Sequence, residues 1–350
     1  MNATTVAPAA DRPRAAAASR FGLLLRREFW EHKGGFLWAP VVAGGIFLLL
    51  ALMGIILGEV ARSRLSDDVR VGDGMGDSVS ISGLDLGMLT DRMGPGELAN
   101  LGNAVDISLF MAMSWPLIVL AFVVFFYCLG ALYDERKDHS VLFWKSLPVS
   151  DRDTVLSKVA SAAVVAPLLA MAAGIATMFG FLVMASTVVL LHGGNPLALL
   201  WGPGSPVTIA AQMVATLPVY AMWSLPTVGW LLLCSSWSRS KPFLWAIMIP
   251  LFAGIFVTWF RLMQFFGEGA AWFWQHVVAR LLLSTVPGAD LLYRGEDFRI
   301  AADGIDQVHQ LMSPAVAYAA FGRPEIWIGA AAGIVMILVA IRLRRWRDEG

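Results

Sequence analysis

Histidines and carboxylates are the residues of this chain whose chemistry would serve catalysis or metal binding. The five histidines are scattered, and no His-Glu-x-x-His pair places two zinc ligands one helical turn apart. The segment Asp73–Asp77, which reads DGMGD, could offer oxygen ligands to calcium, but it lacks the spacing of an EF-hand loop. Its glycines and aspartates are more typical of a solvated turn. We therefore predict no catalytic residue and no metal site on this chain.

Further absences concern nucleotide binding and proteolysis within a membrane. No G-x-x-x-x-G-K-[ST] sequence is present, so the chain has no Walker A loop to hold the phosphates of ATP. The long apolar segments contain no acidic residue away from their ends, which leaves neither an aspartyl pair nor an obvious proton relay. These observations count against intramembrane proteolysis and against ion-coupled transport.

One stretch, YDERKDHSVLFWKSLPVSDRDTVLSK at residues 133–158, concentrates charge between two apolar segments. Ten of its 26 residues are charged, yet it contains the apolar cluster Val141-Leu142-Phe143-Trp144. Exposed apolar clusters often mark a contact with a partner protein. The alternative is that these side chains pack on the protein's own helix ends or on lipid headgroups, where tryptophan is common.

The same stretch also contains signals for where helices begin and end. A short helical turn over Ser140–Lys145 would stop at Pro148, because proline cannot continue a helix. Ser150 or Asp151 would then cap a new helix, which leads through Lys158 into the next apolar segment.

The composition of the whole chain indicates a membrane protein. Of its 350 residues 57% are hydrophobic and only 15% are charged, whereas an average soluble domain has about 25% charged residues. The formal net charge is zero, which argues against nucleic-acid binding, since that function favours a strongly basic domain. Cys128 and Cys234 both lie in apolar segments, so we expect buried thiols rather than a disulfide or a zinc site.

Six apolar stretches are long enough to cross the hydrocarbon layer, which takes ~20 residues of helix. We therefore predict an all-α polytopic membrane protein with six transmembrane helices within residues 36–341. The predicted spans lie near residues 36–57, 108–132, 159–191, 207–234, 242–266 and 326–341. The third is longer than one crossing needs, so Pro167 either kinks it or its first turns lie at the membrane surface.

The distribution of basic residues predicts the orientation of these spans. Four segments together contain 17 of the 26 Lys and Arg residues and are placed on one side of the membrane. They are the N-terminal segment, residues 133–158, residues 235–241 and the tail 342–350. The positive-inside rule then puts both termini and the 133–158 loop in the cytoplasm, with outer loops at 58–107 and 267–325. We expect an integral protein of the bacterial plasma (inner) membrane.

Residues 271–286 are apolar as well, but they contain His276 and Arg280. A seventh span here would move the basic tail outside, and an arginine at the centre of a span costs a few kcal/mol on insertion scales. We predict an interfacial or re-entrant helix on the outer side, a depth that suits Trp272 and Trp274.

The N-terminal region divides into two parts. Residues 1–19 are rich in alanine and proline, lack the layout of a signal peptide and are predicted to be disordered. Residues 20–35 are predicted to form an amphipathic interface helix that ends at Gly34-Gly35. Its apolar face is Phe21, Leu25 and Phe29, and its basic residues at the headgroups include Arg26 and Arg27. The alternative is a simple cytoplasmic extension of the first span.

Beside these elements, the 133–158 stretch resembles the loop between the second and third spans of ABC-2 type ABC transporter permeases. That loop typically carries an acidic-basic pair, an apolar helix, a Ser-Pro-Val-Ser-like turn and a closing lysine. The matching residues here are Glu135 and Arg136, then Leu142 and Trp144, then Ser146, Pro148, Val149 and Ser150, and finally Lys158. The sequence departs from the pattern at His139-Ser140 in place of a Gly-Thr turn, at the inserted Leu147 and at Ser157 in place of a glycine.

The resemblance implies a permease that forms a homodimer, or a heterodimer with a related permease, in the lipid bilayer. ATP and Mg would bind to a separate ATP-binding cassette ATPase, so no cofactor and no enzyme activity are expected on this chain. A cytoplasmic coupling helix in the loop would dock into that ATPase. The residues expected to serve the coupling are Glu135, Arg136, Val141, Leu142, Phe143, Trp144, Ser146, Pro148 and Lys158.

Two other function classes stay open beside the transport subunit. A membrane scaffold or signalling subunit could dock the same ATPase without moving a substrate, and a membrane-embedded enzyme is the third class. A co-purifying ATPase would separate the first two from the third, and substrate-stimulated ATP hydrolysis in liposomes would separate the first from the second. The near absence of charge within the spans favours export of an apolar or amphipathic substrate over an ion. It identifies no substrate-binding residue.

Overall fold

The structure is a computed structural model that describes residues 12–68, 94–138, 149–263, 269–289 and 314–347. Within these residues every element is helical. The α-helices are α1 (Arg12–Lys33), α2 (Ala39–Asp68), α4 (Pro95–Gly130), α5 (Tyr133–Lys137), α7 (Asp151–Ala160), α8 (Ala166–Leu191), α9 (Pro206–Ala215), α10 (Leu217–Trp237), α11 (Pro242–Leu262), α12 (Gly269–Phe273), α13 (Arg280–Leu283), α16 (Pro314–Tyr318) and α17 (Pro324–Arg347). The π-helical segments are η1 (Gly34–Trp38), η2 (Ser161–Val165), η3 (Leu197–Trp201) and η4 (Trp274–Ala279), and η7 (Ala319–Gly322) is a 3₁₀-helix.

Six helices in the described residues are long and apolar enough to cross a membrane, so the prediction of an all-α polytopic membrane protein is confirmed. They cover Arg20–Ala61, Gly96–Lys137, Asp151–Leu191, Leu217–Trp237, Pro242–Arg261 and Pro324–Trp346. Each of them overlaps one predicted span. The side of the membrane that each connection faces stays a prediction.

The predicted fourth span, 207–234, is divided in the structure. The chain forms two helices there, α9 and α10, which are separated at Thr216, and only α10 is long enough to span a membrane. Pro218 explains the break, because a proline supplies no backbone N–H and its ring clashes with the preceding helical turn. It is tolerated in the first turn of α10, where that N–H has no partner within the helix.

The predicted outer loops contain more helix than the hydropathy pattern indicates. α2 continues to Asp68 and α4 begins at Pro95, so both enter the predicted loop 58–107. The predicted loop 267–325 contains the α12, η4, α13 and α16 segments. Hydropathy marks only the apolar part of a helix, and polar turns at either end continue the same hydrogen-bonded spiral. The segment Asp73–Asp77 lies outside the described residues.

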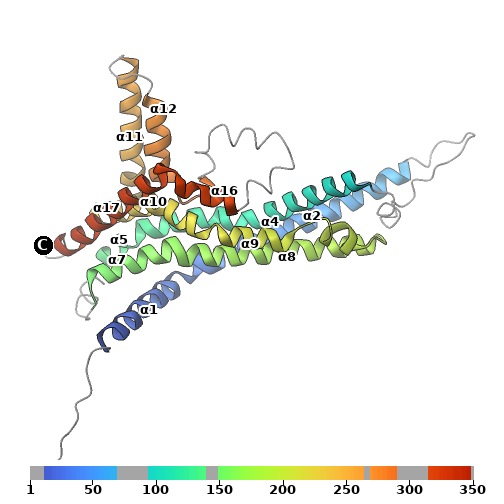
Figure 1. Cartoon of the computed structure of the whole chain (residues 1–350), viewed down its shortest axis with the longest axis horizontal. Coiled ribbons are helices and arrows are strands. Elements are labelled where there is room, and N and C mark those ends of the chain that lie inside the picture. The colour runs from blue at the N-terminus through green and yellow to red at the C-terminus, as the bar shows by residue number, and fades with distance from the viewer. Residues whose placement is uncertain (1–11, 69–93, 139–148, 264–268, 290–313, 348–350) are drawn as a thin grey trace, which may run out of the picture.

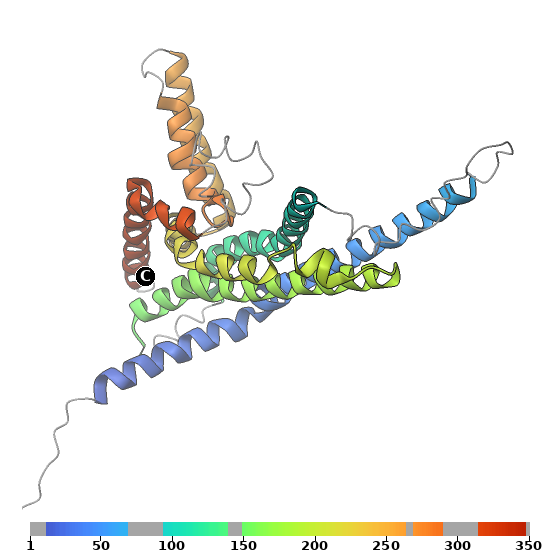
Figure 2. The same ribbon diagram turned by 45° about the vertical axis from the view of Figure 1, so that its right-hand side comes forward.

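The N-terminal helix differs from the prediction at both of its ends. α1 begins at Arg12, so residues 12–19 are helical, where we expected disorder. Gly34-Gly35 does not end it: the π-helical segment η1 joins it to α2, and Figure 2 shows the two helices following one another along one course. The backbone departs from helical geometry only at His32, where φ is −112° and ψ is 17°.

The third span is likewise continuous with the helix that precedes it. α7, η2 and α8 form one helical segment from Asp151 to Leu191. Of the two predicted caps, Ser150 and Asp151, it is Ser150 that caps its start, because Oγ accepts a hydrogen bond of 3.1 Å from the N–H of Asp153. Pro167 follows directly after η2, so the π-helical segment accommodates the proline without ending the helix.

The centre of the fold is a bundle in which α2, α4 and α8 run alongside one another, and α10 packs against both α4 and α17 (Figure 1). The α10–α17 contact is close because glycines face it. A Cβ atom on Gly229 would lie 2.5 Å from the carbonyl oxygen of Gly333, a distance that no side chain tolerates. Small residues allow such close approach in membranes, where van der Waals packing drives helix association.

α11 pairs with α12 and η4 in a hairpin that stands away from this bundle (Figure 1). A Cβ on Gly254 of α11 would lie 2.8 Å from the indole of Trp274, so the glycine is what admits that ring. The Trp274 Nε1–H then donates a hydrogen bond of 2.9 Å to Thr258 Oγ1. The predicted segment 271–286 therefore packs along a spanning helix, and it is too short to be one of the six spans itself.

Candidate functional site

Glu28 of α1 lies at the centre of a group of buried charged residues at one end of the bundle. Only 1% of its surface is exposed. One carboxylate oxygen accepts a hydrogen bond of 2.9 Å from Lys158 Nζ, and the other accepts one of 2.7 Å from the Tyr127 hydroxyl. Since Lys158 belongs to α7 and Tyr127 to α4, a single side chain ties α1 to two spanning helices.

Lys158 and Arg344 extend these contacts to two more helices. Lys158 Nζ also lies 3.0 Å from Glu135 Oε1 of α5, and the lysine is 2% exposed. Arg344 of α17 donates to Glu135 Oε2 at 2.7 Å and to Asp151 Oδ1 at 3.2 Å. Arg27 of α1 approaches Glu135 to 3.8 Å. We call Arg27, Glu28, Glu135, Asp151, Lys158 and Arg344 the ion network.

The positive and negative charges of the ion network balance one another. Three cations alternate with three carboxylates, so no net charge is carried into the protein interior. Removing charged groups from water is expensive, and ion pairing of good geometry offsets that cost without adding much stability. Removing one member is different, because it leaves an uncompensated buried charge. The network therefore specifies how α1, α5, α7 and α17 sit relative to one another.

Arg136 binds the segment that connects α10 and α11 to the same end of the bundle. Its guanidinium donates to the carbonyl oxygens of Ser235 and, at 3.1 Å, Ser238. Ser235 Oγ in turn accepts from the N–H groups of Leu132 and Tyr133 and donates to a carbonyl of α4. The four segments that the charge distribution groups on one side thus meet through described contacts.

The predicted coupling residues divide into two sets in the structure. Glu135 and Lys158 form one ion pair, whereas Arg136 donates to the carbonyl oxygens of Ser235 and Ser238. The other six, namely Val141, Leu142, Phe143, Trp144, Ser146 and Pro148, lie outside the described residues. The ion network therefore lies on both sides of residues 139–148, since Glu135 precedes them and Asp151 follows them.

The buried face of the N-terminal helix is rotated relative to the predicted one. Phe21, Leu25 and Phe29 are only half-buried, whereas Leu24 is 8% and Glu28 1% exposed. The contacts of Glu28 explain this, because its carboxylate must point inward to reach Lys158. Arg26 is exposed, as expected for a basic residue at headgroups. The side chain of Arg27 is only 18% exposed and pairs with Glu31 at 2.7 Å.

The basic tail predicted at 342–350 also differs from the expectation. α17 continues to Arg347, and Arg344 is 5% exposed within the ion network. A signal for this was present in the sequence, because Arg344 follows buried Ile337 and Ala340 at helical spacing. Glu28 had a similar signal, since it follows Leu24 by four residues and so shares its face. Burial was predicted from the sequence for neither residue, because their partners lie on other helices.

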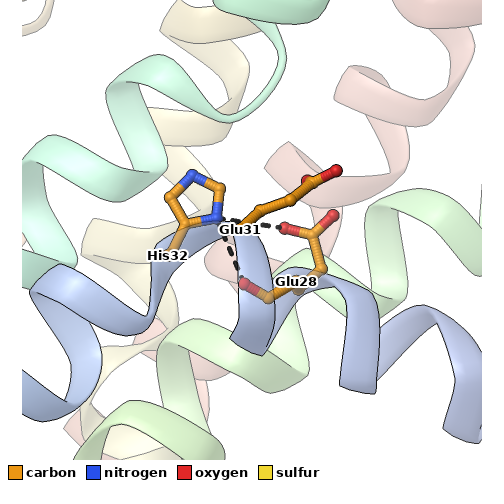
Figure 3. Close-up of side chains that lie close together, drawn as sticks. All are labelled: Glu28, Glu31 and His32. Carbon is orange, nitrogen blue, oxygen red and sulfur yellow. Dashed lines mark hydrogen bonds and ion pairs between the residues drawn. The ribbon is translucent and has the colours of Figure 1, made fainter.

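Glu28, Glu31 and His32 have ligand atoms within 4.8 Å of one another, a spacing that a metal ion could use. Figure 3 shows His32 directed toward Glu28, with its Nδ1 3.2 Å from the backbone oxygen and 4.0 Å from the carboxylate. The carboxylate oxygens of Glu28 already accept from Lys158 and Tyr127, and Glu31 is paired with Arg27. The trio is therefore better explained as one edge of the ion network.

Comparison with protein-family models, with curated proteins and with solved structures finds no match to this chain. Similarity therefore assigns no family. The features that bear on function are the loop sequence and the ion network that flanks it.

Proposed function

We propose that this chain is the membrane-spanning permease subunit of an ABC-2 type ABC transporter. It dimerises and couples ATP hydrolysis by a separate ATPase to export of an apolar or amphipathic substrate. The observation that carries the proposal is the ion network, which joins four helices on both sides of the 139–148 stretch.

A coupling loop must pass the movement of its partner to the spanning helices. In the proposal, the stretch from Val141 to Trp144 docks into the ATPase, and nucleotide-dependent closure of the ATPase displaces it. Glu135 and Asp151 bond to the same Arg344, so a displacement of the loop is resisted by α17 as well as by α5 and α7. Lys158 and Glu28 extend the same resistance to α1. The helices would then move as rigid groups between two states with different nucleotide affinity.

The orientation in this proposal puts the ion network and both termini in the cytoplasm of a bacterium. ATP and Mg bind on the partner ATPase, because this chain has no Walker A sequence. The basic residues of the loop and of the two terminal segments support this orientation.

The test is capture of an ATPase by the purified permease. The tagged chain is isolated from its native membrane in mild detergent, and associated proteins are identified by mass spectrometry. The proposal expects a soluble protein with Walker motifs. Truncating an aromatic anchor at an interface often costs 2 kcal/mol or more, about thirtyfold in affinity. We therefore expect Trp144→Ala to weaken capture about thirtyfold.

Asp153→Ala is the matched control for that variant. Asp153 lies in the same loop region but is exposed, and charges at the rim of an interface usually contribute little to affinity. A small loss is therefore expected. Unchanged capture by a well-folded Trp144→Ala permease would show that the loop is an ordinary connector. In liposomes, ATP hydrolysis that no apolar substrate stimulates would favour the scaffold or signalling subunit.

A further inference from the structure

A cavity of about 180 Å³ lies within one copy of the chain, between α4, α8, α10 and the turn after α13. Its floor is apolar and buried, with Leu117, Leu120 and Met171 each less than 9% exposed. Ile118, which also lines it, is 52% exposed and lies in the middle of a spanning helix. The cavity therefore borders the exposed apolar surface of α4.

Three hydroxyl groups line the cavity, and each has already donated its proton to a backbone carbonyl. Ser114 Oγ donates to Met111 at 2.7 Å, Thr216 Oγ1 to Met213 at 2.7 Å, and the Tyr220 hydroxyl to Thr285 at 2.9 Å. A hydroxyl that has donated its only proton still holds lone pairs and can only accept. These oxygens therefore favour a ligand that brings its own O–H or N–H.

The lining of the cavity also disfavours charged ligands. Among the described residues no charged side chain lines it, so an ion would lose its hydration without a counterion. Trp223, one of the lining residues, already has the guanidinium of Arg280 at 3.2 Å from its ring centroid. That buried cation would repel a second cation brought to the same indole. Gly288, with a φ of 80°, lets the turn after α13 close the cavity as one wall.

We propose that this cavity binds an uncharged apolar molecule about the size of one ring that carries a hydrogen-bond donor, such as a phenol. The size follows from the volume, since an apolar protein cavity of about 150 Å³ accommodates benzene. The donor requirement follows from the three acceptor hydroxyls. This inference concerns a site inside a single chain, and it holds whether or not the chain couples to an ATPase.

The test is photolabelling of the purified full-length chain in nanodiscs with an alkylphenol that carries a diazirine. Labelled residues are located by mass spectrometry, and the unlabelled phenol is added as competitor. We expect saturable labelling at the wall, chiefly at Met171, Met213 and Ile118. Labelling that is not saturable, or that is spread over lipid-facing side chains, would overturn the proposal.

Ser114→Met fills the cavity from α4 and should reduce saturable labelling at least tenfold. Ser108→Met is its matched control, because Ser108 lies on the same helix, makes the same kind of bond to a backbone carbonyl and does not line the cavity. It should leave labelling unchanged. If both variants label like the unmodified chain, the cavity is not the site. Circular dichroism and gel filtration establish that each variant is folded.

The chemical class is tested with competitors that differ in one group. We expect the methyl ether of the phenol to compete at least fivefold more weakly, because it has no donor. Replacing all three acceptors, by Ser114→Ala, Thr216→Val and Tyr220→Phe, should abolish this preference while labelling persists. If the ether competed as well as the phenol, the ligand would not need a hydrogen-bond donor, and that part of the proposal would be wrong. Equal competition by benzoate or benzylammonium would contradict the exclusion of charge.

Discussion

At one end of the bundle six charged side chains cross between four helices. The hairpin of α11 with α12 and η4, which stands away from the bundle (Figure 1), instead exposes many apolar side chains. The members of the ion network reach residues up to 209 positions away in the sequence. The hairpin is held by Trp274 and Thr258, which are 16 positions apart. Polar contacts between residues distant in the sequence thus hold the ion network together, and contacts between residues close in the sequence hold the hairpin.

The difference shows what fixes a helix in a membrane protein. Apolar side chains gain little by leaving lipid for protein, because lipid tails are as apolar as leucine. The exposure of Phe252 and Phe256, 62% each, therefore carries no penalty in a bilayer. Charged side chains have no such freedom, since each must find its partner. The ion network should be intolerant of substitution and the hairpin tolerant, and the following predictions test this from the largest effect to the smallest.

Lys158→Met should have the largest effect on stability. The lysine is shared by Glu28 and Glu135, so its loss leaves two buried carboxylates without their common cation. Breaking a buried pair costs about 3–5 kcal/mol. We expect a fall of this size in the free energy of unfolding, measured by titration with sodium dodecyl sulfate in mixed micelles. Lys33→Met, at an exposed position of α1, is the control and should change it by less than about 0.5 kcal/mol.

The double variant Lys158→Met, Glu28→Gln sharpens this prediction. With Glu28 neutral, Glu135 and Asp151 remain opposite Arg27 and Arg344, so no excess charge is left and part of the lost stability should return. A double variant that is even less stable than Lys158→Met would show that packing around the lysine stem, and not charge, is responsible.

Arg344→Gln should have the second largest effect. It removes the hydrogen bonds to Glu135 and Asp151, but Glu135 keeps Lys158 as a partner. Hydrogen bonds to charged groups contribute about 1.5–3 kcal/mol, and we expect a loss within that range in the same titration. The neighbouring Arg345 is exposed, so Arg345→Gln should be nearly neutral. Equal losses for the two variants would contradict the contacts of Arg344.

The sequence predicted the spanning helices well because hydropathy is a local property. All six spans and the Ser150 cap could be predicted from neighbouring residues. The helix boundaries were less accurate, since η1 and η2 carry the chain through positions where glycine or proline normally ends a helix. The fourth predicted span covers both α9 and α10, because α9 is itself apolar and merges with α10 in a hydropathy pattern.

The ion network could not be predicted in the same way. Glu28 and Lys158 are 130 positions apart, and no periodicity in one helix shows which distant charge will face it. Glu135 and Lys158 were selected through the family resemblance, which did not indicate that they pair with one another. Arg280 was predicted to keep its segment from spanning the membrane, and this role stays a prediction. Its position over the Trp223 ring depends on tertiary packing alone.

Gly254→Ala should have a smaller and local effect. The new Cβ would lie 2.8 Å from the Trp274 indole, so that ring must move away from α11. Overpacking of this kind costs about 1 kcal/mol or more. We expect faster amide hydrogen exchange in η4, measured by mass spectrometry, with unchanged exchange in α7 and α17. Gly54→Ala, where a Cβ meets nothing within 4 Å, is the control. Faster exchange throughout the chain would show that the hairpin is tied to the bundle.

Phe252→Leu should have the smallest effect of all. The side chain is 62% exposed on α11, so a substitution there exchanges one apolar contact with lipid for another. The free energy of unfolding should change by less than about 0.5 kcal/mol, as for most surface substitutions. Phe36→Leu is the matched buried substitution, because Phe36 is 1% exposed and packs edge-on against Tyr127 at 4.8 Å.

In the same titration Phe36→Leu should lose about 1 kcal/mol through the contacts and the aromatic pair that leucine cannot replace. Comparing the two variants measures how much more stability a phenylalanine surrounded by the chain contributes than a phenylalanine surrounded by lipid. If Phe252→Leu destabilised the chain as much as Phe36→Leu, the exposed face of α11 would have a protein contact in the micelle. Cross-linking of the chain at low and high detergent concentration would then identify that contact as a second copy if dimers appeared only in the unmodified protein.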